Sequence, residues 1–135
     1  MIKFTEVKKV YIASPFSHKY KRVMKEREQE INRVIAELTY KYGYSFFGPI
    51  TQSAPLERII PALGGSFSQW KNIDLTWVKA CEELWVVMLD GWDISIGVTE
   101  EISYAQELGK PIRYINPETC QFVTRREQIQ RGIKI

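Results

Sequence analysis

The sequence has little cysteine and histidine, with two cysteines, Cys81 and Cys120, and a single histidine, His18. The two cysteines lie far apart and form no CxxC pair, so they fit neither a zinc site nor the disulfide framework of a small secreted domain. Reduced thiols are the ordinary state of cysteine in the cytosol, and we therefore expect a cytoplasmic protein. No set of metal ligands is indicated, and we predict that the protein needs no metal and no cofactor.

Long apolar runs are also absent. No stretch approaches the roughly 18 apolar residues of a membrane-spanning helix, and charges break residues 1–9 where a signal peptide would have its apolar core. We therefore expect no membrane partner. The net charge of +3, from 19 basic and 16 acidic residues, falls short of the concentrated basic stripe of a duplex-binding protein. A small anionic ligand suits this charge better than duplex nucleic acid.

The two common glycine-rich nucleotide motifs are missing as well. Neither GxGxxG nor GxxxxGKS occurs, which argues against a dinucleotide or P-loop site. Apolar material, in contrast, is plentiful: 44% of the 135 residues are hydrophobic and 13% are aromatic, while 26% are charged. This content is enough for one well-packed core, and the length is too short for two. We expect a single domain spanning residues 1–135.

Hydrophobic patterning predicts strands that alternate with helices. The expected strands cover residues 10–13, 44–47, 84–89 and 112–115, and the expected helices cover about 19–42, 74–83, 98–108 and 124–131, with a short helix and a flexible loop over 55–69. Such alternation implies a parallel sheet with helices on both faces and right-handed crossovers. Ligands bind such sheets outside the carboxyl ends of the strands. Candidate site residues should therefore lie just after strands.

The loop after the first expected strand is one candidate. Ser14, Ser17 and His18 offer two hydroxyls and an imidazole just before a helix whose free N–H groups favour anions, so a phosphate suits this position. The plainer alternative is that the serines cap or turn the chain and that His18 lies on the surface. Taken alone, the loop leaves both interpretations open.

The stretch over residues 90–105 is the most informative. Gly97 lets the backbone approach a ligand at a helix start, Ser95 offers a hydroxyl beside the helix N–H groups, and Glu101 lies about one turn inside. The small Ala105 shares a helix face with Glu101 and leaves room beside the carboxylate. The alternative is that acidic residues near the helix start only offset the helix dipole.

Two further residues have an ordinary explanation when each is taken alone. Asp74 has the pattern of a helix N-cap. Tyr11, inside an apolar strand, has the pattern of a core aromatic. Spacing alone gives neither residue a catalytic role.

Several motifs nevertheless occur together along the chain. They are Tyr11-Ile-Ala-Ser-Pro-Phe-Ser17, Trp70 with Asp74, Cys81-Glu82, Leu89-Asp-Gly-Trp92, Ser95-x-Gly97-Val98-x-x-Glu101, and Ala105 with Gly109-x-Pro111. In order and spacing they resemble the nucleoside 2-deoxyribosyltransferase superfamily over most of the chain. The sequence looks closest to a small bacterial and phage branch catalogued as a domain of unknown function, and it is also similar to the deoxynucleoside 5'-monophosphate N-glycosidases.

The resemblance implies a fold, an activity and a set of site residues. The fold is an α/β, flavodoxin/Rossmann-like three-layer sandwich with a four- or five-stranded parallel sheet. The activity is cleavage of an N-glycosidic bond, with Glu101 as the nucleophile, Asp74 assisting the leaving base and Tyr11 orienting the glutamate. The expected substrate-binding residues are Ser14, Phe16, Ser17, His18, Trp92, Asp93, Ser95 and Gly97. Because two nearby carboxyls push their pKa values apart, we expect Asp74 to hold or share a proton in the working complex and Glu101 to be ionised.

Ser95 decides between two activities. Nucleoside transferases tend to have an aspartate at its position, and a hydroxyl there accommodates a 5'-phosphate that a carboxylate would repel. We therefore favour hydrolysis of a (deoxy)nucleoside 5'-monophosphate, with base exchange by a 2-deoxyribosyltransferase as the alternative. Two departures bear on this choice. The basic tail over residues 131–135 has no clear counterpart of the closing carboxylate that a partner chain supplies in the transferases, and the arginine of the hydrolases' first loop is missing, with His18 as the nearest polar substitute.

Other classes of function remain open at this point. One is a non-catalytic nucleotide-binding sensor on the same fold, and another is a partner surface made by Trp70, Trp77, Trp85 and Trp92. The joint presence of Tyr11, Asp74 and Glu101 favours catalysis. We also expect a homodimer or higher homo-oligomer, because a chain of this length leaves a shallow site that related enzymes complete with a neighbouring chain.

Overall fold

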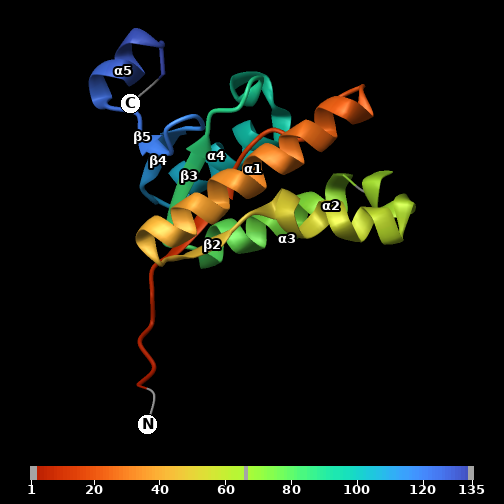
Figure 1. The fold of residues 1–135 in the computed structure, drawn as a ribbon, viewed down its shortest axis with the longest axis horizontal. Helices are drawn as coiled ribbons and strands as arrows, with labels where there is room; N and C mark the ends of the chain where they lie inside the picture. The colour runs from red at the N-terminus through yellow and green to blue at the C-terminus, as the bar shows by residue number, and fades with distance from the viewer. Residues whose placement is uncertain (1–2, 66, 134–135) are drawn as a thin grey trace.

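The computed structural model describes residues 3–65 and 67–133. Its elements follow in the order β1 (Lys9–Ala13), α1 (Lys21–Tyr42), β2 (Ser45–Phe47), α2 (Pro49–Ile59), the 3-10 helix η1 (Pro61–Gly65), α3 (Phe67–Ala80), β3 (Glu83–Val87), the 3-10 helix η2 (Trp92–Ile94), α4 (Ile96–Glu107), β4 (Ile112–Asn116), β5 (Gln121–Phe122) and α5 (Arg125–Gln130). Strands and helices alternate as predicted, and the structure is an α/β sandwich (Figure 1). Within the described residues, no helix combines the length and the apolar character needed to cross a membrane.

The sheet has the strand order β2-β1-β3-β4-β5. β1 pairs in parallel with both β2 and β3, and β3 pairs in parallel with β4. The strand order changes direction between β1 and β3, so the topological switch point lies there. The loops that follow β1 and β3 are therefore placed next to each other at the edge where ligands bind such sheets.

The fifth strand departs from the all-parallel sheet that the sequence predicts. β5 runs antiparallel to β4, with Ile115 opposite Phe122. Only residues 117–120 join the two strands, and the N–H of Cys120 closes the turn by donating to the carbonyl of Asn116 at 2.8 Å. A parallel pair needs a crossover of about a dozen residues or more, whereas a turn this short returns the chain in the opposite direction.

Alternate residues of the central strands face opposite layers. Val10 and Ile12 of β1 pack with α1 and α2 in one cluster, while Tyr11 and Ala13 pack with α3 and α4 in the other. Figure 1 shows α1 crossing the sheet on one side. Because β1 and β3 are buried on both faces, their sequences are continuous apolar runs rather than alternating ones.

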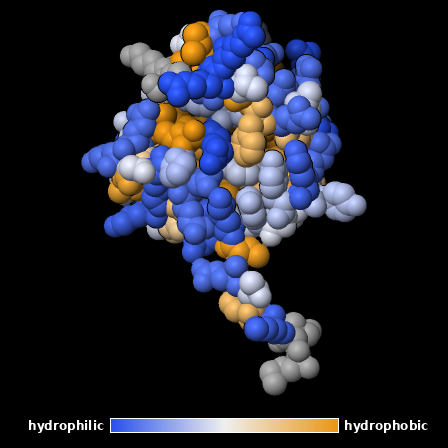
Figure 2. All heavy atoms as spheres, turned by 90° about the vertical axis from the view of Figure 1, so that its left-hand side faces the viewer, coloured by the Kyte–Doolittle hydropathy of each residue, from blue (hydrophilic) through white to orange (hydrophobic). Residues whose placement is uncertain are grey.

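The surface that faces the viewer in Figure 2 carries the projecting N-terminal segment. Hydrophilic side chains cover most of this face, and the apolar ones are scattered among them. Scattered apolar residues are normal on a protein surface and indicate no binding area. The apolar material of the sequence lies mainly in the two clusters on either side of the sheet.

Two helices differ from their predicted bounds. α2 begins at Pro49, a first-turn position where the missing N–H of proline costs nothing, and it continues through Pro55. The carbonyl of Thr51, which Pro55 leaves without a helical donor, belongs to an exposed residue that water can reach. α3 starts well before Asp74, so Asp74 lies inside a helix and the N-cap interpretation of this residue is wrong.

Glu83 is a buried carboxylate at the start of β3. It accepts hydrogen bonds from Lys8 Nζ (2.8 Å), Trp85 Nε1 (3.0 Å) and Arg113 Nε (2.9 Å). Burial raises the pKa of Glu83, but the three donors outweigh burial and lower the pKa to about 2. The ionised carboxylate thus ties the segment before β1 to β3 and β4.

We expect Glu83→Gln to lower the free energy of unfolding by about 1–3 kcal/mol near neutral pH, because an amide makes weaker bonds to Lys8 and Arg113. The pKa of Glu83 is about 2 in the folded protein and 4.5 in an ordinary environment. Its contribution is therefore present above the ordinary pKa and is lost as the pH falls toward the folded value. Urea denaturation should show the difference between wild type and variant shrinking from about pH 6 to about pH 3. A difference that stays constant would show that the charge of Glu83 has no role.

Candidate active site

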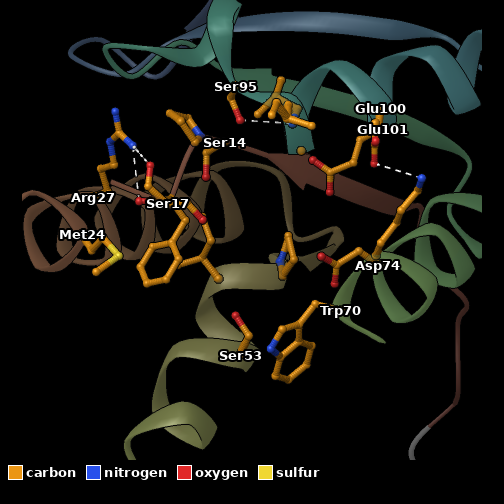
Figure 3. A pocket seen from close by; sticks show the side chains of 18 of the residues that line it. Ser14, Ser17, Met24, Arg27, Ser53, Trp70, Asp74, Ser95, Glu100 and Glu101 are labelled. Carbon is orange, nitrogen blue, oxygen red and sulfur yellow. Dashed lines mark hydrogen bonds and ion pairs between the residues drawn. The ribbon is translucent and has the colours of Figure 1, made fainter. Parts of the chain in front are cut away.

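A cavity of about 690 Å³ lies at the carboxyl ends of β1 and β3 (Figure 3). Its walls come from the loop after β1, the helices α1, α2 and α3, and the loop and first turns that lead into α4. The volume falls in the range of small-molecule sites, roughly 300–1,000 Å³. The cavity occupies the topological switch point, where the sequence predicts the site.

Glu101 reaches the cavity from α4 and is only 7% exposed. Tyr11 of β1 is fully buried and donates its hydroxyl to Oε2 of Glu101. The bond fixes the carboxylate from its buried side and favours the ionised form. The predicted nucleophile and the tyrosine predicted to orient it are thus in direct contact.

Asp74 lines the same cavity from α3 and lies across from Glu101 in Figure 3. Burial raises the pKa of Asp74 to about 7. Burial also raises the pKa of Glu101 to about 8; the hydrogen bond from Tyr11 opposes this rise, while the negative charges of Asp74 and Glu100 add to it. Burial thus raises the pKa of both carboxyls toward neutrality. That Asp74 holds or shares a proton in the working complex stays a prediction.

The loop after β1 lines the cavity with Ser14, Phe16, Ser17 and His18. The Oγ of Ser14 is buried and has no hydrogen-bond partner in the described part of the chain. Buried hydroxyls are nearly always paired, so an atom of a ligand in the cavity is a suitable partner for this one. His18 accepts a hydrogen bond at Nδ1 from the N–H of Tyr20 (3.0 Å), so one of its ring nitrogens serves the local turn.

Ser95 is the N-cap of α4, and its Oγ accepts a hydrogen bond from the N–H of Val98 at 3.3 Å. The first turn of α4 carries no acidic residue, so nothing there offsets the partial positive charge of the helix start. A Cβ added to Gly97 would meet only Ser95 Oγ among the described atoms, at 4.0 Å. The space beside Gly97 fits the predicted close approach of a ligand to the backbone.

Arg27 of α1 lines the cavity although the sequence does not single it out. Its Nη1 donates to the carbonyls of Ser17 (2.9 Å) and Phe16 (3.3 Å), and its Nη2 donates to the carbonyl of Asp90 (3.0 Å). The guanidinium thus ties the loop after β1 to the loop after β3. Gly91 makes room for it, because a Cβ at this position of positive φ would lie 2.8 Å from Nη2. Arg27 is one of many charged residues of α1, and its spacing in the sequence does not mark it as a site residue.

Two of the predicted substrate-binding residues do not line the cavity. Trp92 packs against Tyr114, with ring centroids 5.5 Å apart, and Asp93 is exposed in η2. The six other predicted binding residues line it, together with Asp74 and Glu101. No group of three or more His, Cys, Asp or Glu side chains within residues 3–65 and 67–133 is placed to hold a metal ion.

Sequence reasoning missed the contribution of the helices. Besides Arg27, the lining residues without a predicted role include Met24, Pro49, Ile50, Ser53, Glu57, Trp70 and Lys71. Trp70 belongs to the motifs that carry the resemblance, which is the one signal in the sequence that pointed to it. The residues of α2 were not singled out, because the short helix predicted within residues 55–69 begins after Pro49, Ile50 and Ser53.

Comparison with known proteins places the chain in a family and a fold. The family model described as "Domain of unknown function (DUF1937)" matches residues 8–116. Among solved structures, the chain is similar to a 2-deoxyribosyltransferase from the psychrotolerant bacterium Bacillus psychrosaccharolyticus, with a TM-score of 0.52 and 24% identity over 90% of this chain and 80% of that one. No curated protein matches the sequence significantly. The structural likeness confirms the fold that the sequence resemblance implies.

The buried carboxyl of Glu101 makes stability depend on pH. Its pKa is about 8 in the folded protein against an ordinary value of 4.5, so the folded state binds a proton that the unfolded state releases. The resulting stabilisation is complete below the ordinary pKa and is lost as the pH rises through the folded value. We expect Glu101→Gln, which cannot ionise, to gain stability relative to wild type by on the order of 3 kcal/mol between about pH 5 and pH 9.

The measurement is the unfolding free energy of both proteins by urea titration across this pH range. Glu107→Gln is the matched control, because Glu107 is an exposed glutamate of the same helix. Its stability should follow wild type at every pH. A constant difference between Glu101→Gln and wild type would mean that Glu101 has the same pKa in the folded and unfolded states.

Proposed function

We propose that this chain, which belongs to the family Domain of unknown function (DUF1937), cleaves the N-glycosidic bond of a (deoxy)nucleoside 5'-monophosphate and releases the free base. The observation that carries the proposal is the buried Glu101, oriented by Tyr11 and facing Asp74 across one cavity. An oriented carboxylate and a second carboxyl of raised pKa are the two groups that glycoside cleavage requires. The similarity in fold to a 2-deoxyribosyltransferase supports the same type of reaction.

The first step breaks the bond between sugar and base. The carboxylate of Glu101 attacks the anomeric carbon, the bond to the base nitrogen breaks, and its electron pair leaves with the base while the proton of Asp74 passes to a base nitrogen. The positive charge that develops on the sugar favours the ionised form of Glu101, as does the hydroxyl of Tyr11. Without substrate Glu101 has the higher pKa of the two carboxyls, and the positive charge of the sugar lowers it, so the proton passes to Asp74 when the sugar lies beside Glu101.

The second step regenerates the enzyme. Water attacks the anomeric carbon of the glycosyl intermediate, gives one proton to the carboxylate of Asp74 and releases Glu101 as a carboxylate. The two steps together consume one water molecule and yield the free base and a sugar phosphate. Asp74 thus acts first as an acid and then as a base, which suits a pKa of about 7.

The phosphate is assigned to the end of the cavity that Ser14, Ser17 and Ser95 line. In Figure 3 these serines and Arg27 lie together, on the opposite side of the cavity from Trp70. Arg27 brings a positive charge, α4 brings the N–H groups of its first turn, and Ser14 brings a hydroxyl that lacks a partner within the described chain. These donors suit a phosphate, and the first turn of α4 has no acidic residue that would repel it.

A 2-deoxyribosyltransferase is the second candidate, favoured by the similarity to the Bacillus psychrosaccharolyticus enzyme. In that reaction a second base, rather than water, attacks the intermediate on Glu101. The hydroxyl of Ser95 at the start of α4 favours the nucleotide hydrolase, because a carboxylate at that position would repel a 5'-phosphate.

The test is base release from a panel of deoxynucleosides and their 5'-monophosphates, each with and without a second free base, followed by chromatography. We expect free base to accumulate from monophosphates without a second base. Glu101→Gln should lower turnover by a factor of at least about 1,000, since a nucleophile contributes several kcal/mol to the reaction. Glu107→Gln serves again as the control. More than about a tenth of wild-type turnover in Glu101→Gln would falsify the role of Glu101.

The assignment of the phosphate is tested with Ser95→Asp. Aspartate caps a helix as well as serine does, so the start of α4 should be preserved while a negative charge is added. We expect kcat/KM to fall by at least about tenfold for monophosphates and to change by less than about threefold for nucleosides. Equal losses for the two classes would argue that no phosphate lies at Ser95.

A further inference from the structure

The end of the cavity away from the serines is formed by α2, η1 and α3. Ser53 and Glu57 lie one turn apart on α2, and Trp70 and Asp74 lie one turn apart on α3; all four line the cavity. Figure 3 shows Ser53 and Trp70 together, with Asp74 between Trp70 and Glu101. A base that leaves the sugar at Asp74 would therefore extend along Trp70 toward the wall that holds Glu57.

Glu57 is a half-buried carboxylate that the proposed reaction does not use. Burial raises the pKa of Glu57, and the nearby indole of Trp70 opposes this rise. No arginine or lysine of the described chain forms an ion pair with it. Its Cδ and Oε2 lie 3.8 Å from the point where Gly64 would carry a Cβ, so the carboxylate is close to the backbone of η1. A partly desolvated carboxylate in a cavity wall without a cationic partner can accept hydrogen bonds from a ligand.

Trp70 provides a rigid surface beside this carboxylate. Its indole N–H donates to the carbonyl of Leu63 at 2.9 Å, which fixes the plane of the ring at the cavity wall. Stacking on an aromatic ring tolerates any base, so it positions the base without selecting it. The selection must then come from the polar groups at the edge of the base.

We propose that Glu57 recognises the leaving base through its two carboxylate oxygens and selects guanine. This inference rests on the proposed function. A carboxylate presents two acceptors side by side, and guanine presents two adjacent donors, the ring N1–H and the exocyclic amino group. Adenine and cytosine place an acceptor nitrogen beside their amino group, and thymine places its one N–H between two carbonyls. Each of these three bases would set an acceptor against one oxygen of Glu57.

The experiment measures binding and turnover separately. Binding of dGMP, dAMP, dCMP, dTMP and dIMP is measured by calorimetry in the Glu101→Gln protein, with and without Glu57→Gln. Hypoxanthine, the base of dIMP, keeps the ring N1–H of guanine but lacks the amino group, so it makes one bond to Glu57 where guanine makes two. Turnover of the same nucleotides is measured with Glu101 intact, and Glu107→Gln is the matched control for loss of a glutamate.

With Glu57 present, dGMP should bind at least about tenfold more tightly than each of the other four nucleotides, since each lost charge-assisted bond costs about 1.5–3 kcal/mol. Glu57→Gln should weaken the binding of dGMP more than that of dIMP. It should improve the binding of dAMP relative to dGMP, because an amide matches the edge of adenine. The control variant Glu107→Gln should keep the wild-type preference for dGMP. Absence of a dGMP preference, or equal weakening of dGMP and dIMP by Glu57→Gln, overturns the role of Glu57. If no nucleotide is cleaved, the proposed function fails, while a Glu57-dependent preference for dGMP in the binding measurement still supports base recognition. If no nucleotide binds, both proposals fail.

Discussion

The hydrogen bond from the Tyr11 hydroxyl to Glu101 is the contact on which the site depends. A carboxylate that is 7% exposed is costly to bury unless a donor reaches it, and Tyr11 is the donor that does so from the core. The tyrosine belongs to a central strand, so the bond ties the start of α4 to the middle of the sheet. Ala105, fully buried one turn after Glu101, has a side chain small enough for α4 to lie close to the sheet at this point. The strand, the helix and the carboxylate of Glu101 are thereby held in one arrangement.

A comparison of Glu101 with Glu83 shows how the same side chain can serve two purposes. Both glutamates are buried to the same extent. Glu83 accepts bonds from a lysine, an arginine and an indole, and its pKa falls to about 2; Glu101 accepts one bond from a neutral tyrosine, and its pKa rises to about 8. At Glu101 burial is the largest cause and its one neutral donor does not offset it, whereas at Glu83 three donors, two of them charged, outweigh burial. Glu83 stabilises the fold in its ionised form, whereas the carboxyl of Glu101 binds a proton near neutral pH.

The sequence carries enough information for the sheet and for the cavity wall that holds Glu101. The apolar runs of β1 and β3 follow from burial on both faces, and Glu101 follows from its spacing to Ser95 and Gly97 together with the family resemblance. The antiparallel β5 escaped prediction because two residues carry too little periodicity to be recognised. The start of α2 was predicted too late, because proline usually ends a helix, whereas this helix begins at Pro49 and continues through Pro55. Asp74 looked like an N-cap because the start of α3 has no clear local signal.

Arg27 illustrates why the remaining site residues could not be found along the chain. The loop after β1 has no arginine, but Arg27 of α1 reaches back to the carbonyls of Phe16 and Ser17 and brings a guanidinium to this loop. What a substrate recognises is the position of a charge in space, and a helix packed beside a loop can supply it as well as the loop can. Arg27 and the start of α4 lie at one end of the cavity, and Glu57 lies at the wall formed by α2. Under the proposed function, a nucleotide 5'-monophosphate would place its phosphate at the end that holds Arg27, and its sugar would then lie between Glu101 and Asp74.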